Sequence, residues 1–136
     1  FTRYCDDMTF SGDFDPKPVI ELVKRELGKL GFFLNDKKTA VVRDGQRKTV
    51  TGIVVNEKLN TIGDYRRKLR QELYYCRKYG LESHILHKGL SITEEQYRHQ
   101  LLGRVNYVLQ ITPESKEMQG YKDWLLAEKR HGGSDA

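Results

Sequence analysis

Two adjacent aspartates, Asp6 and Asp7, are the residues of this chain whose type and spacing most directly suggest chemistry. Like charges this close raise each other's proton affinity, so the pair is costly unless a cation or solvent relieves it. Magnesium prefers hard carboxylate oxygens, and phosphoryl transfer uses two divalent cations about 3.5–4 Å apart to bind the attacking and leaving oxygens. The pair therefore indicates either a divalent-metal site or an ordinary solvated turn.

The residues around the pair must position it, and they predict a short hairpin. Residues 1–12 form two alternating arms around a tight acidic tip. Apolar residues then recur at helical spacing, which predicts a helix over 17–30 that packs on the sheet and ends at Gly31. Beyond it we expect a short strand, a polar turn at Asn35–Asp36, a second strand over 39–43 and further strand structure in 48–56.

From Thr61 onward the pattern changes to helical, and it predicts three helices over 64–79, 93–110 and 114–130. Each carries an apolar stripe that would form the core of a bundle. The stripes are, in order, Tyr65, Leu69, Leu73 and Cys76; Tyr97, Leu101, Val105 and Val108; and Met118, Tyr121, Trp124 and Leu125. The expected fold class is α+β, with an N-terminal α+β portion joined to an all-helical bundle.

Composition restricts the partners. The 136 residues are 38% hydrophobic and 32% charged with a formal net charge of +5, which favours an anionic partner such as nucleic acid. No long apolar run or signal peptide is present in these residues, so we expect a soluble cytoplasmic protein and no membrane partner. Cys5 and Cys76 lie far apart and are expected to be packing residues in a reducing compartment. Because it opens on Phe1, the chain is expected to be a piece of a longer protein.

Five segments resemble one known family. The segment "RYCDDMTFSG" (3–12) resembles motif C of reverse transcriptases, in the form found in bacterial retron-type enzymes. The segment "GFFLNDKKT" (31–39) resembles motif D, and "VTGIVVN" (50–56) is similar to the strand that follows it in the retron type. Further on, "YRRKLRQELYY" (65–75) and "LLGRVNYVLQI" (101–111) resemble the thumb of the same enzymes. The resemblance spans nearly the whole chain.

The resemblance implies a fold and an activity. It implies a partial polymerase palm of hairpin, helix and strands over 1–60 and a helical thumb over 61–131. Independently of the resemblance, residues 132–136 are expected to be a disordered tail. It also implies an RNA-directed DNA polymerase that adds deoxynucleotides to a primer 3′-hydroxyl by two-metal nucleotidyl transfer. The implied partners are an RNA template, a DNA primer and deoxynucleoside triphosphates.

The resemblance also assigns roles near the acidic pair. Asp6 would be the metal ligand of motif C, and Asp7 a less direct carboxylate near the same Mg²⁺ ions and the incoming triphosphate. Tyr4 would lie beneath the primer terminus. Lys38, rather than its neighbour Lys37, would assist the leaving pyrophosphate as a proton donor or a positive charge. From spacing alone, the two lysines are equally well a solvated charge run.

Further candidate residues would contact the primer or the template. Gly52 interrupts a strand, which indicates a bulge or a close backbone approach, functional if it faces the primer strand. The expected helix 64–79 is rich in cations that would contact the template–primer duplex by its shape and its 2′-hydroxyls, or would simply form a solvated face. These residues are Arg66, Arg67, Arg70, Arg77 and Lys78. His84 and His87 are expected at the surface near a loop rather than as zinc ligands.

The segments that the family would need upstream, the fingers and the strand with the other metal-binding aspartate, are absent from these residues. We therefore expect this fragment to carry only part of the metal site, to bind no Mg²⁺ and to show no polymerisation by itself. The missing fingers and palm portion of the parent chain are expected to be its partner. Three alternatives stay open. They are a non-catalytic duplex-binding module, an enzyme of the intron-maturase or defence-associated type, and a calcium-binding or structural acidic hairpin unrelated to polymerases.

Overall fold

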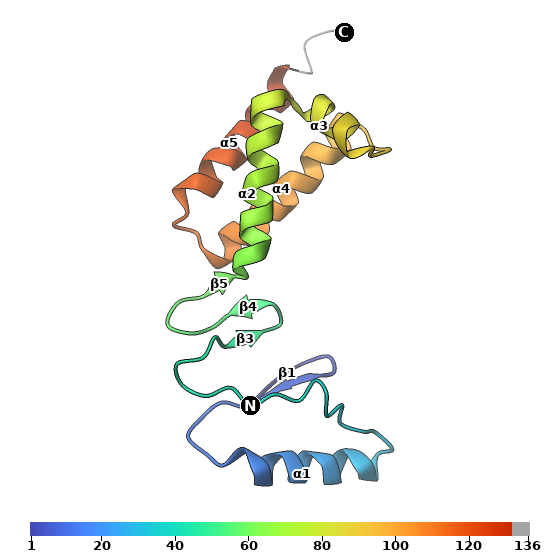
Figure 1. The fold of residues 1–136 in the computed structure, drawn as a ribbon, viewed down its shortest axis with the longest axis vertical. Helices are drawn as coiled ribbons and strands as arrows, with labels where there is room; N and C mark the ends of the chain where they lie inside the picture. Colours follow the sequence, from blue (N-terminus) through green and yellow to red (C-terminus); the bar gives the residue numbers. More distant parts are fainter. Residues whose placement is uncertain (132–136) are drawn as a thin grey trace. The chain divides into compact units, whose positions relative to one another are not determined.

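The computed structural model describes residues 1–131, and the expected disordered tail over 132–136 lies outside the described residues. The architecture is α+β, as expected, with five helices and two small antiparallel sheets in the described part (Figure 1). The chain divides into two compact units: the N-terminal unit, Phe1–Thr51, and the C-terminal unit, which begins at Gly52. The division falls nine residues before the boundary expected at 60/61.

The N-terminal unit begins with the predicted hairpin. Strand β1 (Thr2–Tyr4) pairs antiparallel with β2 (Asp7–Thr9), and Tyr4 lies opposite Asp7 in the register. Helix α1 (Pro16–Lys29) follows, within a residue of its expected bounds. Asp15 caps it by accepting a hydrogen bond from the Lys17 amide at 3.1 Å, and Pro16 suits the first helical position because its missing N–H needs no partner there.

Helix α1 is more exposed than its pattern indicates. None of its residues is buried, so the expected packing of this helix on a sheet is wrong for the described residues. Its apolar residues Val19, Ile20, Val23 and Leu27 are only half-buried, and Leu22 and Leu30 are exposed. An amphipathic helix acquires a buried face only when another element covers it, and no described element of this unit covers α1 in that way.

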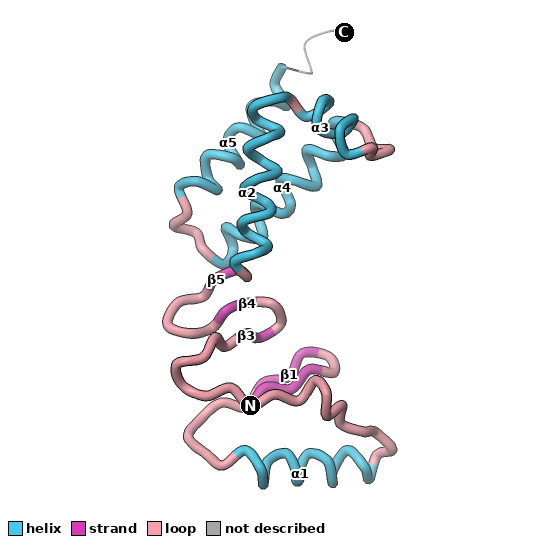
Figure 2. The backbone as a smooth tube through the Cα atoms, in the orientation of Figure 1, coloured by secondary structure: helices cyan, strands magenta, loops and turns pink. Residues whose placement is uncertain are grey.

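The two strands expected on either side of Asn35–Asp36 are also absent from the structure. Residues 30–48 form a long loop, drawn in pink between α1 and β3 in Figure 2. The polar turn itself is present, because the Asn35 side chain accepts from the Lys37 amide at 3.1 Å and its carbonyl accepts from the Lys38 and Thr39 amides at 3.1 and 3.0 Å. A strand needs a neighbour to satisfy its backbone, and no neighbouring strand pairs with this segment among the described residues.

The expected strand structure in 48–56 is a hairpin rather than one strand. Strand β3 (Thr49–Val50) and strand β4 (Ile53–Val54) are separated by Thr51 and Gly52, whose φ angles are 47° and 84°. Positive φ at both central residues is the feature of type I′ hairpin turns. Gly52 is therefore a turn residue and not a bulge, and its conformation rather than its surroundings favours glycine, because an added Cβ would meet nothing within 4 Å.

The C-terminal unit contains two short strands, β4 and β5, and four helices in its described part. Strand β5 (Asn60–Thr61) pairs antiparallel with β4, and helices α2 (Gly63–Tyr79), α4 (Glu94–Ile111) and α5 (Lys116–His131) match the three predicted helices within two residues. Thr93 fixes the start of α4 through a reciprocal capping box with Gln96. The buried apolar residues form one core, which consists of Leu69, Leu73, Cys76, Leu81, Ile85, Tyr97, Leu101, Val105, Val108, Met118 and Leu125. Tyr121 and Trp124, expected in the core, pack against its edge.

A fourth helix, α3 (Leu81–Lys88), was not predicted. Gly80, at φ 91°, ends α2 and begins α3, so the chain turns without an intervening loop. The helix contributes Leu81 and Ile85 to the core and buries His84 as well, so the expectation that His84 lies at the surface is wrong. None of the described helices combines the length and apolar composition needed to cross a bilayer.

Candidate functional site

The acidic pair lies at the tip of the first hairpin. Cys5 and Asp6 form the two-residue turn between β1 and β2, and the Arg3 guanidinium closes it by donating to the Cys5 carbonyl at 3.0 Å. Cys5 has a φ of 51°, a left-handed conformation that costs an L-residue roughly 1–2 kcal/mol. Cys5 is exposed and so is not the packing residue that was expected, whereas Cys76 is buried as expected.

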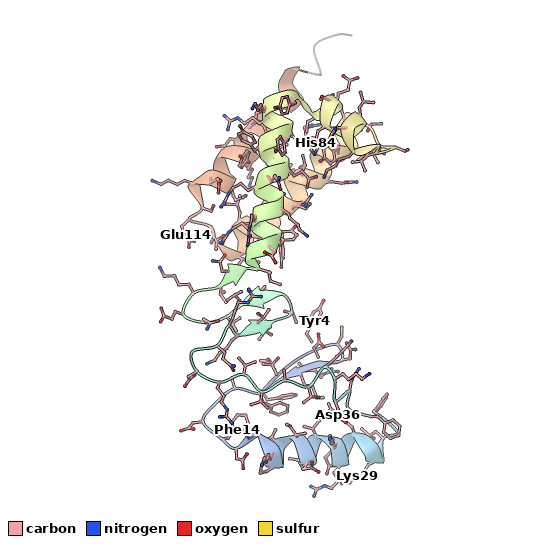
Figure 3. All side chains as sticks on the ribbon, in the orientation of Figure 1. Tyr4, Phe14, Lys29, Asp36, His84 and Glu114 are labelled. Atoms are coloured by element: carbon pink, nitrogen blue, oxygen red, sulfur yellow. The ribbon has the colours of Figure 1, made fainter. Side chains whose placement is uncertain are left out.

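The register of the hairpin places Tyr4 and Asp7 side by side. Directly opposed residues project to the same face of a two-stranded ribbon, so the Tyr4 side chain lies beside the Asp7 carboxylate, and Asp6 lies at the turn next to both. All three side chains are exposed, and neither aspartate takes part in an ion pair within residues 1–131 (Figure 3 labels Tyr4). Both carboxylates are therefore available to a cation.

These two carboxylates fit Mg²⁺ as hard oxygen ligands, but the described residues add nothing to them. No group of three or more histidine, cysteine, aspartate or glutamate side chains gathers anywhere in the described part of the chain. A divalent ion bound here would keep several waters or take further ligands from outside these residues.

Lys38 lies in the turn that follows α1. Asp36 connects this turn to the helix through an ion pair with Lys24 at 3.0 Å, and Figure 3 shows Asp36 beside α1. The hydrogen bond from Lys24 to Asp36, together with the attraction between their charges, raises the pKa of Lys24. Lys38 is exposed, and no ion pair joins it to Asp6 or Asp7 in the described chain. The structure therefore presents Lys38 at the surface of the same unit without bringing it into contact with the aspartates.

Gly52 belongs to a small pocket of the C-terminal unit. The pocket has a volume of about 340 Å³ and is lined by Gly52, Thr61, Ile62, Tyr65 and Tyr107. The Thr61 hydroxyl is buried there without a hydrogen-bond partner among the described residues, and Tyr65 contacts Tyr107 edge to face. A close approach of another strand at Gly52 is compatible with this open space.

The five cations of α2 occupy two neighbouring faces. Arg66, Arg70 and Arg77 follow one another at i, i+4 and i+11, which places them on one flank of the helix. Arg66 donates to the Asn60 side chain, and Arg70 pairs with Glu117 of α5 at 2.7 Å. This flank of α2 therefore faces α5, and two of its three arginines already have partners.

The other two cations are also engaged. Arg67 pairs with Asp64 at 2.9 Å, and the Lys78 ammonium lies 5.7 Å and 5.2 Å from the ring centroids of Tyr74 and Tyr79. Exposed ion pairs of this kind contribute only about 0–1 kcal/mol, so a phosphate can replace the carboxylate at small cost. The expected phosphate contacts of α2 stay a prediction.

The charged cluster around Glu72 was not predicted from the sequence. The Glu72 carboxylate, only 11% exposed, accepts hydrogen bonds from the Tyr97 hydroxyl and from Arg104 at 2.8 Å, and pairs with Lys88 at 3.1 Å. Burial acts to raise the pKa of Glu72, but the bonds from Tyr97, Arg104 and Lys88 outweigh it and lower the pKa overall. The same cluster borders a cavity of about 830 Å³ whose walls come from α2, α3 and α4.

Two curated proteins resemble this chain, and both are reverse transcriptases. The chain is 35% identical over 120 residues to the retron Mx65 reverse transcriptase of Myxococcus xanthus, a match that covers 86% of this chain and 25% of that protein. It is 38% identical over 68 residues to the retron Mx162 reverse transcriptase of the same organism, covering 41% of this chain and 14% of that protein. The chain thus spans about a quarter of the length of the first relative.

These relatives confirm the resemblance that the five segments indicated. The chain is homologous to reverse transcriptases, and among them to those of retrons. No family model and no solved structure matches it significantly. The match to the Mx65 relative extends over most of both units. It therefore covers much more of the chain than the short motifs around Asp6 and Lys38.

Proposed function

We propose that this chain is the part of a retron-type reverse transcriptase that carries the catalytic hairpin and the thumb. The whole protein is proposed to add deoxynucleotides to a primer 3′-hydroxyl, directed by an RNA template. The observation that carries the proposal is the hairpin: Asp6 lies in its turn and Asp7 lies opposite Tyr4, both carboxylates exposed, in a chain related to retron reverse transcriptases. Residues 1–60 then belong to the palm and residues 61–131 to the thumb.

The proposed roles follow from the chemistry of each side chain. Asp6 and Asp7 would hold Mg²⁺, which would supply charge neutralisation at the phosphate and activation of the primer hydroxyl in nucleotidyl transfer. Tyr4, on the same face of the ribbon as Asp7, supports the primer terminus. The exposed ammonium of Lys38 stabilises or protonates the leaving pyrophosphate. Helix α2 follows the template–primer duplex, which it recognises by backbone shape rather than by base identity.

Primer extension on an RNA template tests the proposal. A longer protein that contains this chain together with the remaining palm and fingers is expected to extend the primer. The 136-residue chain alone is expected to incorporate nothing, because its described residues supply two carboxylates and no further metal ligand. Templated incorporation by the chain alone would contradict the inference that it carries only part of the metal site. Failure of the longer protein to extend any primer would contradict the proposed polymerase activity.

Replacing Lys38 by alanine in the longer protein is expected to slow single-turnover incorporation by about a hundredfold, the lower range of what a positioned proton donor contributes. Lys37→Ala is the matched control, because Lys37 is the adjacent exposed lysine of the same turn. Rapid-quench measurement of the first incorporation separates this effect from primer binding. Equal losses in the two variants would show that only the charge of the turn matters and would remove the role assigned to Lys38.

The net charge of +5 and the cations of α2 also favour a second candidate function, a duplex-binding module without catalysis. It predicts that binding to the template–primer duplex is the only activity of the longer protein. Extension that depends on Asp6 distinguishes the polymerase from the module.

A further inference from the structure

Four aromatic rings from three helices form a ladder in the C-terminal unit. Successive rings are Tyr79, Tyr75, His84 and Tyr97, with centroids 6.1, 6.5 and 6.1 Å apart and ring planes within 19°, 14° and 19° of parallel. The ladder begins in the core, where Tyr97 is 2% and His84 is 9% exposed. It reaches the surface at Tyr75, 39% exposed, and Tyr79, 58% exposed. A further planar group can therefore stack on the exposed rings of Tyr75 and Tyr79.

The outer part of this ladder lines the large cavity. Tyr75, Tyr79 and His84 contribute to its walls, and its volume of about 830 Å³ lies within the range of roughly 300–1,000 Å³ that is usual for small-ligand sites. The Nε2 atom of His84 is buried with no hydrogen-bond partner in the described chain. Burial, with the nearby charge of Lys88, lowers the pKa of His84, so this ring is neutral and contributes an aromatic face rather than a charge.

The charges around the cavity are mainly positive. Lys68, Lys88 and Arg104 line it, against the single acid Glu72. Lys88 and Arg104 are already bonded to Glu72, whereas Lys68 takes part in no ion pair within residues 1–131. One uncommitted ammonium beside stacked rings matches a ligand that has both a planar base and an anionic phosphate.

The cavity lies on a different flank of α2 from Arg66, Arg70 and Arg77, and it meets the cations expected to contact a duplex at Lys78, whose ammonium lies 5.2 Å from the Tyr79 ring centroid. Lys68, Tyr75 and Tyr79 follow one another at i, i+7 and i+11, on the flank of α2 that faces α3. Arg70 pairs with α5 on the opposite flank. A paired base is stacked inside its helix and cannot lie against protein rings, so the cavity suits a base that has left the duplex.

We propose that this cavity binds one unpaired nucleotide of a nucleic-acid strand, with its base stacked on Tyr79 and Tyr75 and its phosphate on Lys68. The proposal goes beyond the polymerase function, because it requires neither a metal ion nor the aspartates of the hairpin. It assigns to the thumb a contact with single-stranded nucleic acid in addition to any contact with the duplex.

Fluorescence anisotropy with the 136-residue chain tests this proposal. The probes are a labelled single strand, as DNA and as RNA of the same sequence, and a blunt duplex of equal length. Tyr79→Leu keeps an apolar side chain but removes the stacking face, and it is expected to weaken binding of the single strand roughly tenfold. Tyr79→Phe keeps the ring and is expected to bind like the unchanged chain. Lys68→Gln is expected to weaken single-strand binding and to reduce its dependence on salt.

The chain offers matched controls for both changes. Tyr74→Leu removes a tyrosine of similar exposure from the same helix, and Lys116→Gln removes an exposed lysine on α5; neither lines the cavity. The proposal is overturned if Tyr79→Leu binds single strands like Tyr74→Leu, if the duplex loses affinity by the same factor, or if no single strand binds. Since no arm of the experiment involves catalysis, these outcomes leave the polymerase proposal to be judged by primer extension.

Discussion

An Asp6→Asn substitution in a longer protein that contains this chain is expected to lower the rate of primer extension on the order of a thousandfold. A bound divalent ion stabilises the charge of the transition state by several kcal/mol, and each 1.36 kcal/mol corresponds to a factor of ten in rate. Asparagine keeps the shape of the side chain and tolerates turns, so the hairpin between β1 and β2 is expected to persist. Single-turnover extension measures the loss.

Binding of the template–primer duplex is the companion measurement. Asp6 is exposed and takes part in no ion pair within the described residues, so its replacement should leave duplex affinity unchanged. Asp13→Asn is the matched control, because Asp13 is an exposed aspartate of the loop that follows the hairpin and lines no candidate site. Unchanged extension by the Asp6 variant, or an equal loss in the Asp13 variant, would refute the assignment of Asp6 as a metal ligand.

The second large effect is expected for Glu72→Ala, which should lower the free energy of unfolding by about 3 kcal/mol. Hydrogen bonds to a charged group contribute about 1.5–3 kcal/mol each. The substitution removes the acceptor shared by Tyr97, Arg104 and Lys88, and so loosens the contacts among α2, α3 and α4. It also leaves the buried Tyr97 hydroxyl without its acceptor. Urea unfolding followed by far-ultraviolet circular dichroism measures the change.

Glu82→Ala is the control for this prediction, because Glu82 is an exposed acid in the first turn of α3. A surface substitution of this kind usually changes the free energy of unfolding by less than about 0.5 kcal/mol. If the Glu72 and Glu82 variants unfold at the same urea concentration, the cluster does not stabilise the helical unit.

The Glu72 carboxylate also gives this stabilisation a pH dependence. Its pKa in the folded chain lies below the ordinary value of 4.5, so the folded state holds its proton less tightly than the unfolded state. The contribution is fully present above pH 4.5 and is lost as the pH falls through the lowered pKa of the folded state. The Glu72→Gln variant should lack this part of the acid dependence.

Local patterns predicted most of the helices and the presence of the first hairpin. The apolar stripe of α2, with Leu69, Leu73 and Cys76, repeats at helical spacing and is buried as expected. The first hairpin was predicted, but its turn is Cys5–Asp6, one residue before the expected Asp6–Asp7 tip, and Asp7 begins β2. Short helices carry less signal, and α3 has only Leu81 and Ile85 as apolar core residues, which explains why it was missed.

Long-range relations explain the errors. The segments on either side of Asn35 have strand-like composition, but a strand exists only with a partner, and sequence spacing does not identify one. Burial of His84 depends on Tyr97, thirteen residues away on another helix, and on Tyr75. The cavity beside Glu72 was missed for the same reason, since its walls combine residues of three helices.

The two units differ in how their unfolding can be observed. None of residues 1–51 is buried, whereas the C-terminal unit buries a core of eleven apolar side chains. The denaturant m-value and the heat-capacity change of unfolding both scale with the surface that becomes exposed. Melting of this chain therefore reports the cooperativity of the helical unit, and the hairpin that holds Asp6 contributes almost nothing to that signal. Integrity of the hairpin has to be followed residue by residue, by amide exchange or by nuclear magnetic resonance of β1 and β2.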